Sequence, residues 1–229
     1  MDARKYEILG EQVRELDGGV RVHRIRRLSD GALGGFVQSE ENLSQQGTCW
    51  IHDDAVASGA ARVVEDAQLR GRAAVSGQAR ISGKAVVQDD ATVGGKARVQ
   101  GEARVERHAA VSGEAEVSGS AELSDHAVAA DHARISGKCH LWGLMRVTGD
   151  SKLEGAYPVS GAQFGLRHNL TVTGGHVLFG DKRYTHAQWQ KLPPQDLARI
   201  GIRADMRLAL LELTEALRKL STLHETVGR

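Results

Sequence analysis

Apolar and polar positions alternate through the middle of the chain with a period of six residues. Stepping by six from Ile51 to Leu153 meets Val, Ile or Leu at sixteen of eighteen positions. The residue four positions later is Ala at all fourteen steps from Ala55 to Ala133. Gly fills twelve of the eighteen positions that lie two residues after the aliphatic one. The repeat is therefore aliphatic-x-Gly-x-Ala-x.

This hexad predicts a parallel β-helix of triangular coils. Ala and Val are two residues apart, so both point to the inner side of a strand while their neighbours point outward. Gly accepts backbone angles that other residues resist, which lets the chain turn sharply between strands, and Ala fits the narrow corners. Three strands make a coil of 18 residues, so residues 51–158 give six coils. At about 4.8 Å per coil, the prism would be about 29 Å tall.

The flanking segments predict caps for the exposed strand edges of the β-helix. We expect an all-β fold with an α-helical tail, in four parts. Residues 1–44 form an N-terminal β cap with a hairpin around Asp17-Gly18-Gly19, and residues 45–158 form the β-helix. Residues 159–192 form a hairpin around Gly174-Gly175 and a short helix with Thr185 as N-cap. Residues 193–229 form a helical segment, with one long helix from 203 to about 225.

The long C-terminal helix carries an apolar seam at coiled-coil spacing. Spacings of four and three alternate along Met206, Leu210, Leu213, Leu217 and Leu220. Two alternatives follow. The helix self-associates through this seam, which we favour, or it folds back to cap its own β-helix.

The 18-residue coil sorts the outward side chains onto three faces. One face is basic and one is mixed. The third carries Val56, Ala74, Thr92, Ala110, Val128 and Arg146, with Ser58, Ser76, Gly94, Ser112, Ala130 and Thr148 beside them. Eleven of these twelve residues are small or uncharged, in a chain with 26% charged residues. Because exposed uncharged patches usually mark contacts, this face is predicted to be a homo-oligomer interface, with a trimer favoured over a dimer.

Histidines are the only side chains in the sequence that suggest a catalytic or metal site. No phosphate-binding loop, dinucleotide fingerprint, paired-cysteine motif or nucleophile elbow occurs. His108 and His126 are eighteen residues apart, so they stack on the corner column that begins Asp54, Arg72, Asp90. This column predicts a solvated ladder of opposite charges, with a metal or catalytic role as the alternative.

His132 lies at the next corner, one strand of about 13 Å from His126. One chain therefore cannot place His126 and His132 on one ion, although two chains could, and no metal site is expected.

Composition and cysteine spacing bear on the partners of the protein, its cellular location and the state of its cysteines. The 229 residues carry a net charge of +1, which gives no support to an attraction for nucleic acid or for an anionic membrane. The sequence contains no run of about 18 apolar residues, the length needed to span a bilayer. The N-terminus also lacks the apolar stretch of a signal peptide, so we expect a cytoplasmic protein. Cys49 and Cys139 share one corner column about 24 Å apart, beyond the approximately 7 Å disulfide limit, and are expected to be buried thiols.

The hexads resemble the left-handed β-helix of the hexapeptide-repeat superfamily, which holds many trimeric acyltransferases. The stretch "RVHRIRRLSDGALGGFVQSEENLSQQGTCWIHDDA" and the repeats after it resemble the YdcK-like β-helix proteins and their bacteriophage and prophage relatives. "VTGGHVLFGDKRYTHAQWQKL" resembles the strand-then-HxxxW tail of the phage-borne relatives. Together these cover about residues 20–192. The resemblance implies left-handedness and a bacterial or phage origin. It implies no activity, because a fold does not establish a function.

Three functions stay open. The first is a non-catalytic, oligomeric structural or interaction protein without a cofactor, which binds itself and, as an open alternative, a host or phage protein. The second is a hexapeptide-type acyltransferase that uses acetyl-CoA or another acyl-CoA, with His108, His126 or His132 as general base at a subunit cleft. Known members often extrude a loop to shape that cleft, and the register here has no insertion. The third is a sequestering protein that holds a small anion between subunits at Arg72 and Arg107.

Overall fold

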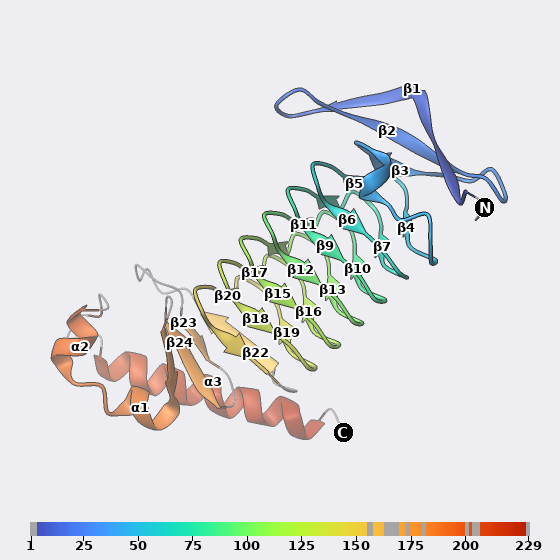
Figure 1. Ribbon diagram of the computed structural model, residues 1–229. Helices are drawn as coiled ribbons and strands as arrows, with labels where there is room; N and C mark the ends of the chain where they lie inside the picture. The colour runs from blue at the N-terminus through green and yellow to red at the C-terminus, as the bar shows by residue number, and fades with distance from the viewer. Residues whose placement is uncertain are drawn as a thin grey trace.

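The structure is a computed structural model, and it describes residues 4–154, 158–162, 170–172, 175–179, 182–199, 202 and 207–227. A hairpin lies across one end of a row of stacked coils, and a small antiparallel sheet with three helices closes the other end (Figure 1). The predicted class, a parallel β-helix with an N-terminal hairpin and a C-terminal helix, is confirmed.

The β-helix consists of eighteen two-residue strands that begin every six residues and pair in parallel with the strands eighteen residues away. The small-residue face consists of β5 (Val56–Ala57), β8 (Ala74–Val75), β11 (Thr92–Val93), β14 (Ala110–Val111), β17 (Val128–Ala129) and β20 (Arg146–Val147). The basic face consists of β6 (Arg62–Val63), β9 (Arg80–Ile81), β12 (Arg98–Val99), β15 (Glu116–Val117), β18 (Arg134–Ile135) and β21 (Lys152–Leu153). The mixed face consists of β4 (Trp50–Ile51), β7 (Gln68–Leu69), β10 (Val86–Val87), β13 (Arg104–Val105), β16 (Glu122–Leu123) and β19 (His140–Leu141).

The core is a column of aliphatic walls and alanine corners, as the hexad predicts. Ala103 and Val105 of one coil are both fully buried, and so are the equivalent Ala121 and Leu123 one coil further on. Because each corner alanine is fully enclosed, an inward side chain larger than a methyl group would have to displace its neighbours.

Each turn from β4 to β21 contains one residue in the left-handed backbone region, and most of these residues are glycines. Gly95 shows why, because its φ is 69° and an added Cβ would lie 2.6 Å from the carbonyl oxygen of Gly113 in the next coil. The turn backbones therefore stack too closely for most side chains, which explains the glycine column in the sequence.

Six turns carry a residue other than glycine in this conformation, and five of those residues are Asp or Glu that bond to the next coil. The carboxylate of Asp89, for example, accepts a hydrogen bond of 3.0 Å from the backbone N–H of Arg107. The same bond to the residue eighteen positions later is made by Asp53, Glu65, Asp125 and Asp131. Acidic residues thus replace glycine where their side chains can satisfy a turn N–H that the ladder leaves free.

The N-terminal cap pairs β1 (Tyr6–Leu16) antiparallel with β2 (Val20–Arg27), and β2 with β3 (Leu33–Val37). β3 already pairs in parallel with β5, so the parallel ladder begins inside the segment predicted as cap. Beside it lies the 3-10 helix η1 (Glu40–Asn42), whose buried Asn42 amide donates to the carbonyls of Gly59 and Ala61 at 2.9 Å each. Lys5 Nζ donates to the Cys49 carbonyl at 3.0 Å. These side chains close the first coil's free edge.

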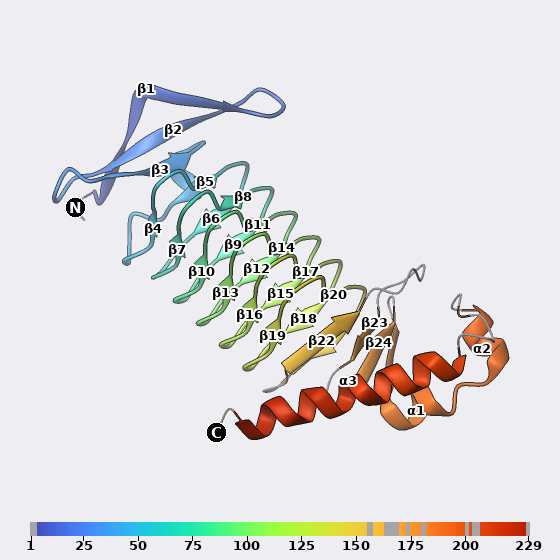
Figure 2. The same cartoon turned by 180° about the vertical axis from the view of Figure 1, so that it is seen from behind.

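The C-terminal cap continues the sheet of the mixed face. β22 (Pro158–Ala162) pairs in parallel with β19, and β23 (Leu170–Val172), β24 (His176–Phe179) and β25 (Lys182–Thr185) follow antiparallel. The helices are α1 (His186–Gln190), α2 (Pro194–Arg199) and α3 (Arg207–Val227), and α3 lies along the sheet (Figure 2). Thr185 caps α1 as predicted, because its side chain accepts from the Gln188 N–H. Cys49 and Cys139 are buried free thiols, as expected.

The tight corner packing predicts that Ala103→Leu destabilises the coil. Overfilling a packed site typically costs about 1 to 3 kcal/mol of unfolding free energy, which thermal or urea unfolding would measure. Val86→Leu, an outward change on the mixed face, is the control and should leave the melting temperature nearly unchanged. An unchanged melting temperature for Ala103→Leu would contradict the packing described above.

The turn carboxylates predict that Asp89→Ala lowers the unfolding free energy by about 1 to 3 kcal/mol. It leaves the Arg107 N–H without its acceptor and puts alanine in the left-handed region. Asp89→Asn keeps an acceptor oxygen and should lose less, while Asp89→Gly isolates the lost hydrogen bond from the backbone strain. Equal stability of the alanine and asparagine variants would show that the carboxylate bond contributes nothing.

Candidate functional surfaces

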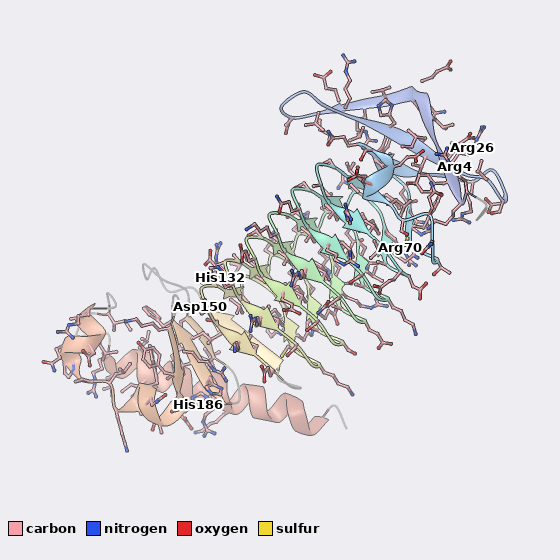
Figure 3. All side chains as sticks on the ribbon, in the orientation of Figure 1. Arg4, Arg26, Arg70, His132, Asp150 and His186 are labelled. Atoms are coloured by element: carbon pink, nitrogen blue, oxygen red, sulfur yellow. The ribbon has the colours of Figure 1, made fainter. Side chains whose placement is uncertain are left out.

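The outer surface of the β-helix has charged columns at its corners. On the first corner Arg72 pairs with Asp90 at 2.8 Å, and on the second Lys96 pairs with Glu114 at 2.9 Å. The second column continues through His132, whose Nδ1 lies 3.6 Å from the Asp150 carboxylate; both side chains are labelled at one edge of the prism in Figure 3. At these positions a carboxylate therefore lies one coil away from a basic side chain, as cross-strand pairing favours.

The candidate histidines lie where the register predicts. His108 and His126 stack on one column with ring centroids 4.9 Å apart and an interplanar angle of 10°. His132 lies on the other corner of the small-residue face. No group of three or more potential metal ligands occurs among the described residues.

Both candidate anion-binding arginines already have carboxylate partners one coil away. Arg72 pairs with Asp90, and Arg107 pairs with Asp125. A hydrogen bond from the Gly143 N–H and then the Arg107 guanidinium hold the pKa of Asp125 below its usual value. The corner arginines are therefore occupied with intramolecular pairing, which weakens the anion-sequestering hypothesis.

The predicted interface residues divide into a covered and an uncovered group. Val56 packs with Val22 and Phe36 of the N-terminal cap, and Ser58 is also buried. The uncovered surface thus begins one coil later, with Ala74 and Ser76. It continues over half-exposed or exposed Thr92, Gly94, Ala110, Ser112, Val128 and Ala130.

The apolar side of α3 faces its own chain. Leu210 is buried in a cluster with residues of β23, β24, α1 and α2, and Leu213 and Leu217 pack partly against it. Met206 lies outside the described residues, as does the side chain of Leu220. The capping alternative therefore accounts for Leu210, which a self-association seam would have needed on the surface.

A polar cluster that the sequence patterns did not single out lies on the mixed face. A hollow of about 410 Å³ is lined by Glu106, Glu122, Ser124, His140 and Trp142, with Arg107 and Asp125 at its edge. His140 Nε2 lies 3.2 Å from Ser124 Oγ and 3.7 Å from a Glu122 carboxylate oxygen. A catalytic relay uses the two ring nitrogens for different partners, so this arrangement gives no nucleophile activation. Only the 16-residue diagonal spacing of Ser124 and His140 could have revealed it.

Comparison with known proteins assigns neither a family nor a function to the chain. No protein-family model matches the chain, and no curated protein sequence matches it. The fold is consistent with a hexapeptide-repeat β-helix. No helix among the described residues is long and apolar enough to cross a membrane.

The cluster on the mixed face predicts a pH-dependent gain from Glu106→Gln. Burial, followed by the nearby carboxylates of Glu122 and Asp89, raises the pKa of Glu106 above that of an ordinary glutamate. The ionised form is therefore disfavoured in the folded protein, and stability falls as pH rises from the unfolded pKa through the folded pKa. Glutamine keeps an oxygen for Gln88, which donates to Glu106 at 3.0 Å.

We expect a higher melting temperature for Glu106→Gln at pH 7 and no difference near pH 3, where glutamate is protonated in both states. Calorimetry at a series of pH values would measure this. A difference that stays constant with pH would refute the electrostatic origin.

Proposed function

We propose that the protein is a non-catalytic, oligomeric β-helical module of bacterial or phage origin, which serves as a structural or interaction component. The small-residue face is its assembly surface. The observation that carries this proposal is the contrast between faces. The mixed and basic faces bear long polar side chains, whereas from Ala74 to Ala130 this face bears only alanine, serine, glycine, threonine and valine, and Arg146 follows at its end. Short side chains on a regular sheet permit close approach of another rigid surface.

The two corners that flank this face support a ring of subunits. At one height the first corner carries Asp90 and the second carries Lys96; one coil further on they carry His108 and Glu114. A contact between the first corner of one chain and the second corner of the next would place the Asp90 carboxylate near the Lys96 ammonium and His108 near Glu114. Such a head-to-tail contact closes into rings, which favours a trimer over a two-fold dimer.

The described geometry counts against catalysis at these corners. The strands from β4 to β21 begin every six residues without an inserted loop, and an acyl-donor site of the hexapeptide type is commonly shaped by such a loop. His132 has Glu114 and Asp150 above and below it in its own column. These histidines are therefore explained as members of the charged corner columns.

Ala110→Glu tests the assembly surface. A carboxylate at the centre of a close-packed interface would be buried without a partner, so the variant should keep its fold and melting temperature but run as a monomer. Mass spectrometry under non-denaturing conditions would give the native mass, and Val86→Glu on the mixed face is the control with the same added charge. If Ala110→Glu kept the wild-type oligomeric mass, the small-residue face would not be the interface.

The same measurement with acetyl-CoA separates the alternative function. We expect no uptake by the wild-type protein. Binding of acetyl-CoA to an oligomer, lost in Ala110→Glu, would instead favour the acyltransferase, and His108, His126 and His132 would be the residues to substitute next.

A further inference from the structure

The basic face carries a row of five cations and one carboxylate, Glu116, which the ladder holds in register. Arg62 is the direct cross-strand partner of Arg80, and Arg80 is the partner of Arg98. Neighbouring coils are about 4.8 Å apart. Beyond Glu116 the row continues with Arg134 and Lys152. Five cations thus project from one line along the β-helix axis.

Like charges directly opposite each other destabilise a sheet, and this chain avoids them elsewhere. At its corners Arg72 lies beside Asp90, and Lys96 lies beside Glu114. On the basic face, by contrast, Arg62 lies 3.6 Å from Glu41 and Arg80 lies 3.8 Å from Glu65, both outside hydrogen-bonding range and largely exposed.

The remaining cations of the row are less engaged still. Within the part of the chain that the structure describes, no ion pair forms at Arg98, Arg134 or Lys152. Glu116 is the direct cross-strand partner of both Arg98 and Arg134. Like charges therefore face each other from Arg62 to Arg98 and again at Arg134 and Lys152, and an anion bound there would remove that cost.

A second row of neutral polar side chains runs beside the charges. It consists of Ser82, Gln100, Ser118 and Ser136, each two residues after a member of the charged row. Ser118 and Ser136 are partly exposed, and Gln100 donates to Glu116 at 2.6 Å. Arg80 and Arg134 are thus each followed by a serine, which is buried at Ser82 and partly exposed at Ser136, and Arg98 is followed by the Gln100 amide.

We propose that the basic face binds a linear acidic polysaccharide that lies along the β-helix axis. Such a polymer repeats a carboxylate or sulfate together with several hydroxyls. Guanidinium groups bind oxyanions with paired hydrogen bonds, and serine and amide side chains can bond to sugar hydroxyls. The inference concerns a different face from the proposed assembly surface and goes beyond the proposed function.

The composition of the face favours a polysaccharide over a single-stranded nucleic acid. Proteins that bind single strands combine basic grooves with aromatic side chains on which bases stack. The twelve outward positions of the basic face, from Arg62 to Glu154, include no aromatic residue. Charge and hydroxyl recognition is what this face offers.

Binding of a fluorescent oligogalacturonate at physiological ionic strength tests the proposal. The double variant Arg80→Gln/Arg98→Gln should weaken binding about tenfold or more, since it removes two charge-assisted hydrogen-bond donors. The matched control Arg70→Gln/Arg104→Gln removes the same charge from the mixed face (Arg70 is labelled in Figure 3) and should change affinity by less than about threefold. The methyl-esterified, neutral oligosaccharide should not bind.

Several outcomes would overturn the inference: no binding by the wild-type protein, equal losses in the two double variants, equal binding of the neutral oligosaccharide, or tighter binding of single-stranded DNA. Melting curves verify that both double variants fold, and Arg80→Gln/Arg98→Gln should melt no lower than wild type because it relieves like-charge contact. Ala110→Glu should retain oligogalacturonate binding, so a failure of the assembly proposal is distinguishable from a failure of this one.

Discussion

The parallel ladder between coils fixes nearly every other feature of this molecule. Each residue lies one coil from the residue eighteen positions later, so residues with the same place in the coil are stacked along the axis. In the core this repetition requires alanine at the corners, because stacked corners leave no room for larger groups. At the turns it brings backbones so close that Gly95 cannot gain a side chain without contacting Gly113. The alanine and glycine positions of the hexad follow from that close stacking.

The same repetition governs charge. A side chain in a β-helix column has two fixed neighbours, and their signs determine whether the column is stabilised or strained. On the corner columns Arg72 lies beside Asp90, and His132 lies between Glu114 and Asp150. Exposed pairs of this kind contribute little individually, but they relieve the columns of like-charge contact. In the row from Arg62 to Arg98, by contrast, like charges lie directly opposite each other. This is the reason for proposing the row as a binding surface.

Periodic features could be predicted from the sequence, and features that depend on non-repeating contacts could not. The strand register, the buried corners, the stacked pair His108 and His126 and the cap at Thr185 follow from spacing or from local chemistry. The burial of Val56 and Ser58 depends on where the N-terminal hairpin folds over the first coil. No period in the sequence encodes that contact.

The apolar seam of α3 shows why an apolar pattern alone does not determine what the helix packs against. A heptad-like row predicts that one side of a helix is covered, and it is equally satisfied by a second helix or by a sheet of the same chain. In this molecule the C-terminal cap closes the end of the β-helix, and its strands β23 and β24 present an apolar surface that includes Leu170, Val172 and Phe179. Leu210 covers that surface. The need to close the end of the ladder therefore explains the seam within one chain, and it leaves the faces of the prism as the surfaces available for partners.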